Sequence, residues 1–282
     1  MLVTRQFTSS GRTLSGPCDV RPAHADLSPT VANLKRSTRL CPTRQSERNE
    51  LMSNPSTTAL STIRGTAYTF NTPDPIAGAV IKVVEFPEVS ATTTTNGSYE
   101  LQVPAGSKAT PYIEAAGHSS IHLQTFTLDD AHEGSDIDGV NFQTPTHDIY
   151  DGLKVLVESF IGRDPFEGGG VIVSTVSDAK VVGMPFDQFI EFHSHGVPGA
   201  VAFITPALAR PIYFNQDVIP DNTQSTTSID GGVLWPNVPP GRYVLTAELE
   251  GKTFARVEVE CEIGRVVNAN PVWGLHEIPS AS

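Results

Sequence analysis

The residues best suited to chemistry lie between Met184 and Gly196, a stretch with two histidines and two carboxylates. They are Asp187, Glu191, His193 and His195. Imidazole and carboxylate groups are ligands that zinc and iron accept, and such a set can leave one coordination position open for an activated water. One hypothesis is therefore a metal-dependent enzyme or a metal-binding protein that uses the stretch 184–196.

The same stretch fits two conformations, and each would use a different set of ligands. Residues at the helical spacing i, i+3, i+4 and i+7 are Phe186, Phe189, Ile190 and His193. On such a helix His195 lies on the opposite side, with the two carboxylates, whereas a strand places His193 and His195 on one face. The alternative to a metal site is an amphipathic helix that covers a sandwich and pairs its charges on the surface.

Other catalytic signals are weak. The chain has no G-x-S-x-G elbow of the kind that carries a hydrolase serine. The loop 129–138 gathers five carboxylates and His132, which predicts either a calcium site or a solvated acidic turn. We expect no cofactor, with a divalent metal as the alternative.

The strands and turns that must position these residues occur as two similar copies in the sequence. In the first copy, Asn96-Gly97 separates two β-prone runs, which is typical of a hairpin with a type I′ turn, and 104–106 ends the returning strand. In the second copy the turn is Asp230-Gly231, and 239–241 ends the strand. The repeat predicts two modules of about seven strands each.

The segments GTA at 65–67, PIAGAV at 75–80, ATTTTNGSYEL at 91–101 and VPAG at 103–106 resemble the carboxypeptidase regulatory-like domain. That domain is a transthyretin-like, or prealbumin-like, β-sandwich. The resemblance covers roughly 62–143 well and 169–270 more loosely. It implies a non-catalytic accessory role, and it permits a carbohydrate-binding module, because starch-binding domains have a related sandwich.

We therefore predict an all-β protein of two tandem seven-stranded transthyretin-like β-sandwiches joined by one α-helix. The predicted parts are a disordered leader (1–61), the first sandwich (62–144), a connecting helix and linker (145–167), the second sandwich (168–272) with an insertion at 178–198, and a tail (273–282). The helix is expected to start at Thr144-Pro145 and to end at Gly162. Its expected apolar stripe is Ile149, Leu153, Leu156 and Phe160.

Three further residues are candidates for ligand binding: Trp235, Asp230 and Glu250. Aligning 238–241 with 103–106 puts Trp235 at the position of Glu100, on the outward face of its strand. There the indole is either covered by the helix or the other module, or exposed for stacking on a sugar or a partner. If neighbouring strands are antiparallel, the insertion shares one end of the sandwich with the turns that hold Asp230 and Glu250.

Composition limits the classes of partner. The chain of 282 residues has a net charge of −12, and its first 51 residues hold eight basic and four acidic side chains. The remaining residues hold eleven and twenty-seven, a net charge of −16, which argues against nucleic acid and leaves a protein or a glycan as the partner. The sequence shows no signal peptide and no transmembrane segment, so we expect a cytoplasmic protein, with Met52 an alternative start and targeting by the leader the other interpretation.

Overall fold

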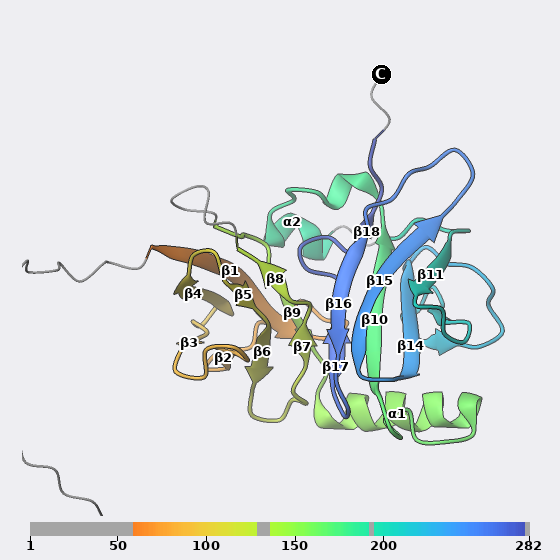
Figure 1. Cartoon of the computed structure of the whole chain (residues 1–282), viewed down its shortest axis with the longest axis horizontal. Helices are drawn as coiled ribbons and strands as arrows, with labels where there is room; N and C mark the ends of the chain where they lie inside the picture. Colours follow the sequence, from red (N-terminus) through yellow and green to blue (C-terminus); the bar gives the residue numbers. More distant parts are fainter. Residues whose placement is uncertain (1–58, 129–135, 192–194, 280–282) are drawn as a thin grey trace, which may run out of the picture. The chain divides into compact units, whose positions relative to one another are not determined.

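The computed structural model describes residues 59–128, 136–191 and 195–279. The strands of its first half are β1 (Leu60–Thr69), β2 (Val80–Val83), β3 (Ser90–Thr92), β4 (Ser98–Pro104), β5 (Lys108–Ala109), β6 (Pro111–Glu114), β7 (His122–Leu123), β8 (Phe126–Thr127) and β9 (Phe142–Thr144). Those of the second half are β10 (Gly170–Ser177), β11 (Val201–Thr205), β12 (Ile212–Phe214), β13 (Pro220–Asp221), β14 (Gly232–Val238), β15 (Gly241–Glu248), β16 (Val257–Cys261), β17 (Val266–Asn268) and β18 (Leu275–His276). The helices are α1 (His147–Ile161), the short 3-10 helix η1 (Ala179–Val181) and α2 (Phe186–Glu191), so the chain is mostly β, as predicted (Figure 1).

The strand pairing repeats between the two halves. Strand β1 pairs antiparallel with β4 and parallel with β9, and β10 pairs in the same way with β14 and β17. Strand β6 lies between β2 and β7, just as β15 lies between β11 and β16. The repeat in the sequence thus reappears in the hydrogen-bonding pattern.

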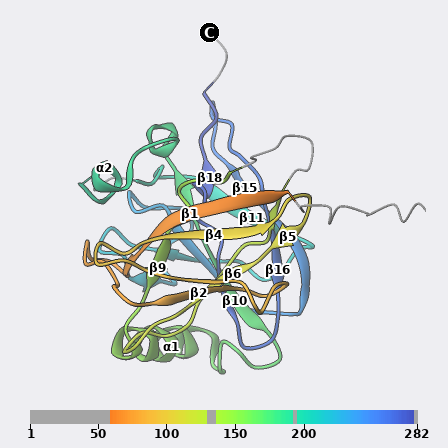
Figure 2. The ribbon, with the colours of Figure 1, turned by 90° about the vertical axis from the view of Figure 1, so that its left-hand side faces the viewer.

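Each half buries its own core between two layers. Along β4, Tyr99, Leu101 and Val103 are buried while the residues between them are more exposed, as the period of two predicts. Figure 2 shows β1 and β4 lying over β2 and β6, with this first core between them. The second core contains Tyr213, Trp235 and other apolar residues of the second half.

The halves are also joined edge to edge, which differs from two sandwiches linked only by a helix. Strand β17 pairs in parallel with β7, with Val267 opposite His122 and Asn268 opposite Leu123. This seam makes one ten-stranded sheet that runs through both halves. An unpaired strand edge presents free backbone N–H and C=O groups, and the seam satisfies them for both strands.

The prediction of a hairpin at Asn96-Gly97 is wrong. Strand β3 pairs with β2 and strand β4 pairs with β1, so the turn links strands of two different sheets. The N–H of Gly97 donates to the carbonyl of Thr94 (2.9 Å), and that of Thr94 donates to the carbonyl of Ser98 (2.9 Å). Gly97 has φ of 79° and Asn96 does not adopt positive φ, so the turn is not type I′ either.

Helix α1 begins two residues later than predicted, at Thr146 instead of Thr144. Its N-cap is Thr146, whose side chain accepts a hydrogen bond from the N–H of Ile149, and it ends at Gly162 with φ of 72°. The side that packs on the sheet carries Tyr150, Leu153 and Val157, and Phe160 packs against the same cluster. Leu153 and Phe160 of the predicted stripe therefore lie on the packed side, whereas Ile149 is 47% exposed. Lys154 also lies on the packed side, with its ammonium 5.9 Å from the centroid of the Phe166 ring.

We expect Val157→Asp to detach α1 from the sheet. Val157 is 3% exposed and packs with Ile212, Phe214 and Leu234, so a carboxylate there would be desolvated without a partner. The expected loss is about 3 kcal/mol of unfolding free energy, measured by urea titration. The control is Val155→Asp on the 66% exposed face of the same helix, and an equal effect of both changes would contradict this packing.

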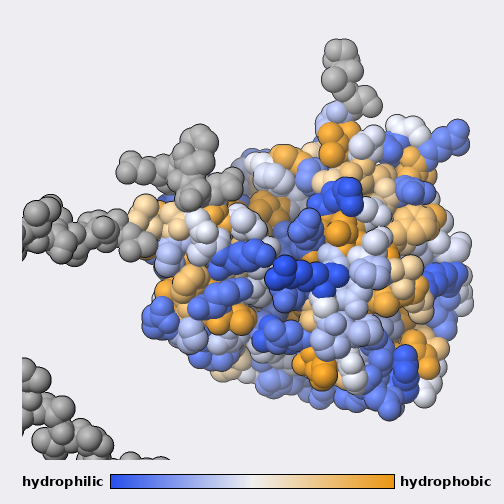
Figure 3. Space-filling model, viewed as in Figure 1, coloured by the Kyte–Doolittle hydropathy of each residue, from blue (hydrophilic) through white to orange (hydrophobic). Residues whose placement is uncertain are grey.

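The surface mixes hydrophilic and hydrophobic residues. Exposed apolar side chains such as Val155 and Phe203 are scattered over separate elements, which is ordinary for a folded protein. Figure 3 shows this mixture on one face. Among the helices of the described residues, none has the length and apolar character needed to cross a membrane.

Candidate functional site

The insertion of the second half reaches the first half. Helix α2 carries no buried residue, but the ring of Phe186 at its start lies 5.0 Å from the ring of Tyr68 on β1. The prediction of a short helix near Phe186 is thus confirmed, and the ring at the start of this helix contacts the other half of the chain.

His195 has a local role. Its Nε2 donates to the backbone carbonyl of Phe189 (2.8 Å), and its ring stacks on the Phe189 ring with centroids 4.2 Å apart. Asp187 and Glu191 are exposed on α2, and His193 lies outside the described residues. Within the described ranges, no group of three or more His, Cys, Asp or Glu side chains is arranged to hold a metal ion. The metal site stays a prediction that depends on His193.

Asp230 lies beside the end of the insertion, as predicted. The N–H of Gly196 donates to the carbonyl of Ile229 (3.0 Å), and a Cβ on Gly196 would meet the backbone of Gly231. The carboxylate of Asp230 accepts from the N–H of Gly232 (3.0 Å), and burial raises the pKa of Asp230. Asp230 therefore shapes its own turn.

Glu250 belongs to a different feature. It borders a depression on the outer side of the β11-β15-β16 sheet, together with Phe203 and Arg256. The structure thus brings the insertion to the turn of Asp230 and places Glu250 at another depression.

Trp235 faces inward, so the prediction of an outward indole is wrong. It is 1% exposed and belongs to the second core. The strand pairing puts Trp235 opposite Ile172, which is where Leu101 stands opposite Ile63 in the first half. The ladder is irregular between Gly170 and Ile172, and Asn237 has φ of 57°. A one-residue bulge exchanges the two faces of a strand, and this reverses the side predicted from the alignment.

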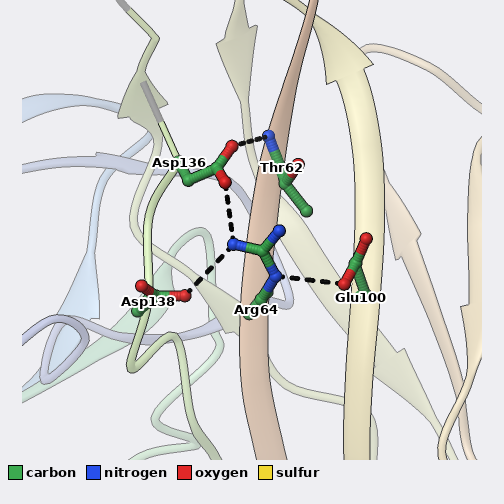
Figure 4. A network of polar contacts seen from close by, with 5 residues as sticks. All are labelled: Thr62, Arg64, Glu100, Asp136 and Asp138. Atoms are coloured by element: carbon green, nitrogen blue, oxygen red, sulfur yellow. Dashed lines mark hydrogen bonds and ion pairs between the residues drawn. The ribbon is translucent and has the colours of Figure 1, made fainter. Parts of the chain in front are cut away.

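A polar network on the first half was not predicted. Arg64 of β1 donates from Nε to Glu100 (3.0 Å) and from Nη1 to Asp136 (2.8 Å), and Nη1 lies 3.5 Å from Asp138 (Figure 4). Asp136 also accepts from the N–H of Thr62 (3.0 Å). These contacts lower the pKa of Asp136 and raise that of Arg64, because each charged form is stabilised by the other.

This network borders a groove of about 600 Å³, the Arg64 groove. Its side chains come from β1, β3, β4, the 138–141 segment, the insertion and the tail: Arg64, Thr92, Ser98, Glu100, Asp138, Asn141, Met184, Phe186 and Trp273. The polar members belong to the first half, and the apolar wall of Met184, Phe186 and Trp273 is supplied by the second. The groove therefore exists only where both halves meet.

Trp273 belongs to the tail and borders the Arg64 groove, with its ring edge-on to that of His276 and the ring centroids 5.9 Å apart. The register of β1 and β4 places Arg64 opposite Glu100, but β2 and β3 separate these strands in the chain, so no local signal in the sequence predicts the pair. The contribution of the tail had none either.

Comparison with protein-family models gives no match, and no curated protein matches significantly. Among solved structures, similarity is found to a type II cohesin-X-dockerin complex from Acetivibrio cellulolyticus, at 19% identity over 31% of this chain, with a TM-score of 0.24. The Bacillus anthracis TIE protein is 13% identical over 75% of this chain and 33% of its own, with a TM-score of 0.26. GBS52, the minor pilin of Streptococcus agalactiae, is 12% identical over 79% of this chain and 98% of its own, with a TM-score of 0.25. The chain spans 59% of the first of these structures.

Proposed function

We propose that the chain is a non-catalytic binding module and that the Arg64 groove binds a carbohydrate. The observation that carries the proposal is the combination of an aromatic wall with fixed charged groups in one groove. The carboxypeptidase regulatory-like character suggested by 62–143 and the accessory role that it implies are part of this proposal.

The chemistry of the groove suits a sugar. A sugar ring has apolar C–H faces that pack on aromatic rings such as Trp273 and Phe186, and hydroxyls around its rim that donate and accept hydrogen bonds. Carboxylates can accept more than one hydrogen bond, so Glu100 and Asp138 can accept from hydroxyls while they contact Arg64. Asn141 also borders the groove, and its Oδ1 accepts from the N–H of Thr66 (2.8 Å), which orients the side chain.

The network also reduces the cost of binding. Arg64 is held by contacts to Glu100 and Asp136, so its side chain has already lost much of the freedom that a free arginine would lose on binding. A groove that keeps its shape without ligand is expected to bind with a smaller entropic penalty.

The test is a glycan array followed by calorimetry with the oligosaccharide that binds best. Trp273→Ala is expected to weaken binding about tenfold, because aromatic packing contributes roughly 0.5–1.5 kcal/mol beyond the area it buries. Asp138→Ala is expected to weaken it by a similar factor. Phe203→Ala, an exposed aromatic on β11, is the matched control. Absence of any glycan ligand for the folded protein, or equal affinity of all three variants, would contradict the proposal.

A further inference from the structure

We infer that the outer edge of β4 is a self-association site, at which two copies of this chain pair their β4 strands antiparallel. The inference does not depend on the proposed carbohydrate binding. Strand β4 ends the sheet β4-β1-β9, and its seven residues make it the longest strand at the end of a sheet in the described ranges. Figure 1 shows β4 at the outer end of the first half, where a second copy can approach it.

Two residues of β4 direct their backbone hydrogen-bonding groups away from β1. Arg64 of β1 uses its N–H and C=O on the side opposite to β4, with the carbonyl of Ile137 (2.8 Å) and the N–H of Val140 (2.9 Å). Glu100 lies opposite Arg64, so the groups of Glu100, and those of Gln102 two residues on, also point outward. No described residue pairs with these groups. The edge thus presents two N–H and two C=O groups.

Both ends of this free stretch are closed by the chain itself. On one side, the carbonyl of Ser98 already accepts from the N–H of Thr94 (2.9 Å). On the other side, Pro104 has no N–H to donate. The free stretch is therefore short, and Leu101 is its centre.

A second copy of β4 matches this stretch in one register. With Leu101 opposite Leu101 of the second copy, each Glu100 pairs with the other copy's Gln102, and every free N–H meets a free C=O. Farther out, the occupied carbonyl of Ser98 lies opposite Pro104, the residue that has no N–H to offer. A shift by two residues would set Glu100 opposite either the second Glu100 or Pro104. Because the stretch is complementary to itself, its partner is a second copy of this chain.

The second half shows that this edge position accepts a strand. Strand β14 corresponds to β4, because β10 pairs with β14 as β1 pairs with β4. The outer edge of β14 is covered by β12, where Ile212 lies opposite Leu234, the counterpart of Glu100. In the first half, the chain between β2 and β4 forms only β3, which pairs with β2. A second copy would occupy on β4 the position that β12 occupies on β14.

Sedimentation equilibrium of the full chain at increasing concentration tests the inference. We expect a monomer–dimer equilibrium that Gln102→Pro abolishes, because proline removes an outward N–H at the centre of the contact. The hydrogen bonds between β1 and β4 do not use that N–H, so the circular dichroism spectrum should stay the same. A chain that is monomeric up to millimolar concentration, or a folded Gln102→Pro variant that dimerises as tightly as the unchanged chain, would overturn the inference.

Two charge variants test the register without a proline. Gln102→Lys sets a lysine opposite Glu100 of the second copy and should tighten the dimer about fivefold, whereas Gln102→Glu should weaken it by a similar factor. The same changes at Gln188, which is exposed on α2, control for net charge and should have little effect. Trp273→Ala, which alters the Arg64 groove, should leave dimerisation intact. Equal effects at Gln102 and Gln188 would contradict the pairing.

Hydrogen exchange distinguishes a second copy from any other occupant of the edge. The amides of Glu100 and Gln102 should exchange more slowly as the protein concentration rises. Those of Tyr99 and Leu101, which face β1, should not change. Protection of Glu100 and Gln102 at every concentration would mean that another part of the chain covers the edge, and it would overturn the inference.

Discussion

Trp235→Ala is expected to lower the free energy of unfolding by about 3–5 kcal/mol. The indole is 1% exposed at the centre of the second core, where it packs among residues such as Tyr213 and Leu245. Removing it deletes the largest fully buried side chain and leaves a cavity that strands on both sides cannot collapse into. Since domains are stable by roughly 5–15 kcal/mol, this is a large part of the total.

Urea titration followed by circular dichroism measures this effect. Trp235→Phe is the matched variant: it keeps an aromatic ring and removes the indole N–H, which has no hydrogen-bond partner among the described residues. Its loss is expected to be less than half that of the alanine variant, because a buried N–H without a partner is itself unfavourable. Trp273→Ala, at the groove, should change stability by less than about 0.5 kcal/mol. A loss below 1 kcal/mol for Trp235→Ala would show that the indole is outside the core.

Gly65→Ala is expected to destabilise the first half by about 3 kcal/mol, at the upper end of overpacking effects. A Cβ on Gly65 would lie 1.9 Å from the carbonyl oxygen of Val140 and 2.5 Å from its carbonyl carbon. These are backbone atoms of a segment that is tied to β1, since the N–H of Val140 donates to the carbonyl of Arg64 (2.9 Å). The segment must move away, and it carries Asp138 away from Arg64 with it.

Calorimetry of Gly65→Ala and Gly152→Ala tests this contact. Gly152 lies in α1, and a Cβ added there would have no other described atom within 4 Å. Alanine at this position should therefore stabilise the protein by about 0.5–1 kcal/mol. The two identical substitutions should therefore shift the melting temperature in opposite directions. Shifts of the same sign would mean that β1 and the 138–141 segment are not in close contact.

The parts of the fold that depend on local pattern could be predicted from the sequence. Alternation in β4, the glycine at each of the two repeated turns and the glycine that ends α1 each act over a few residues, and they led to the strands, the repeat and the helix. The parts that depend on a single irregular residue could not. The bulge near Asn237 reversed the side on which Trp235 lies.

The candidate site was less predictable than the fold. Residue types directed attention to His195 and its neighbours, but this ring packs against Phe189. The network of Arg64 joins residues 36 and 72 positions apart, and no local spacing reports such a contact. The pairing of Arg64 with Glu100 follows from the register of β1 and β4, whereas the contribution of Trp273 requires knowing how the halves meet.

The parallel seam between β7 and β17 has a consequence for how the protein can be divided. If the chain were cut beyond α1, each half would keep its own core but would present a bare strand edge where the other had been. Such an edge is a template for pairing with another copy, so the separated halves would tend to self-associate. The Arg64 groove would lose its aromatic wall. We therefore expect the seam edges of the two repeats to be protected from self-association only while the repeats stay joined in one chain.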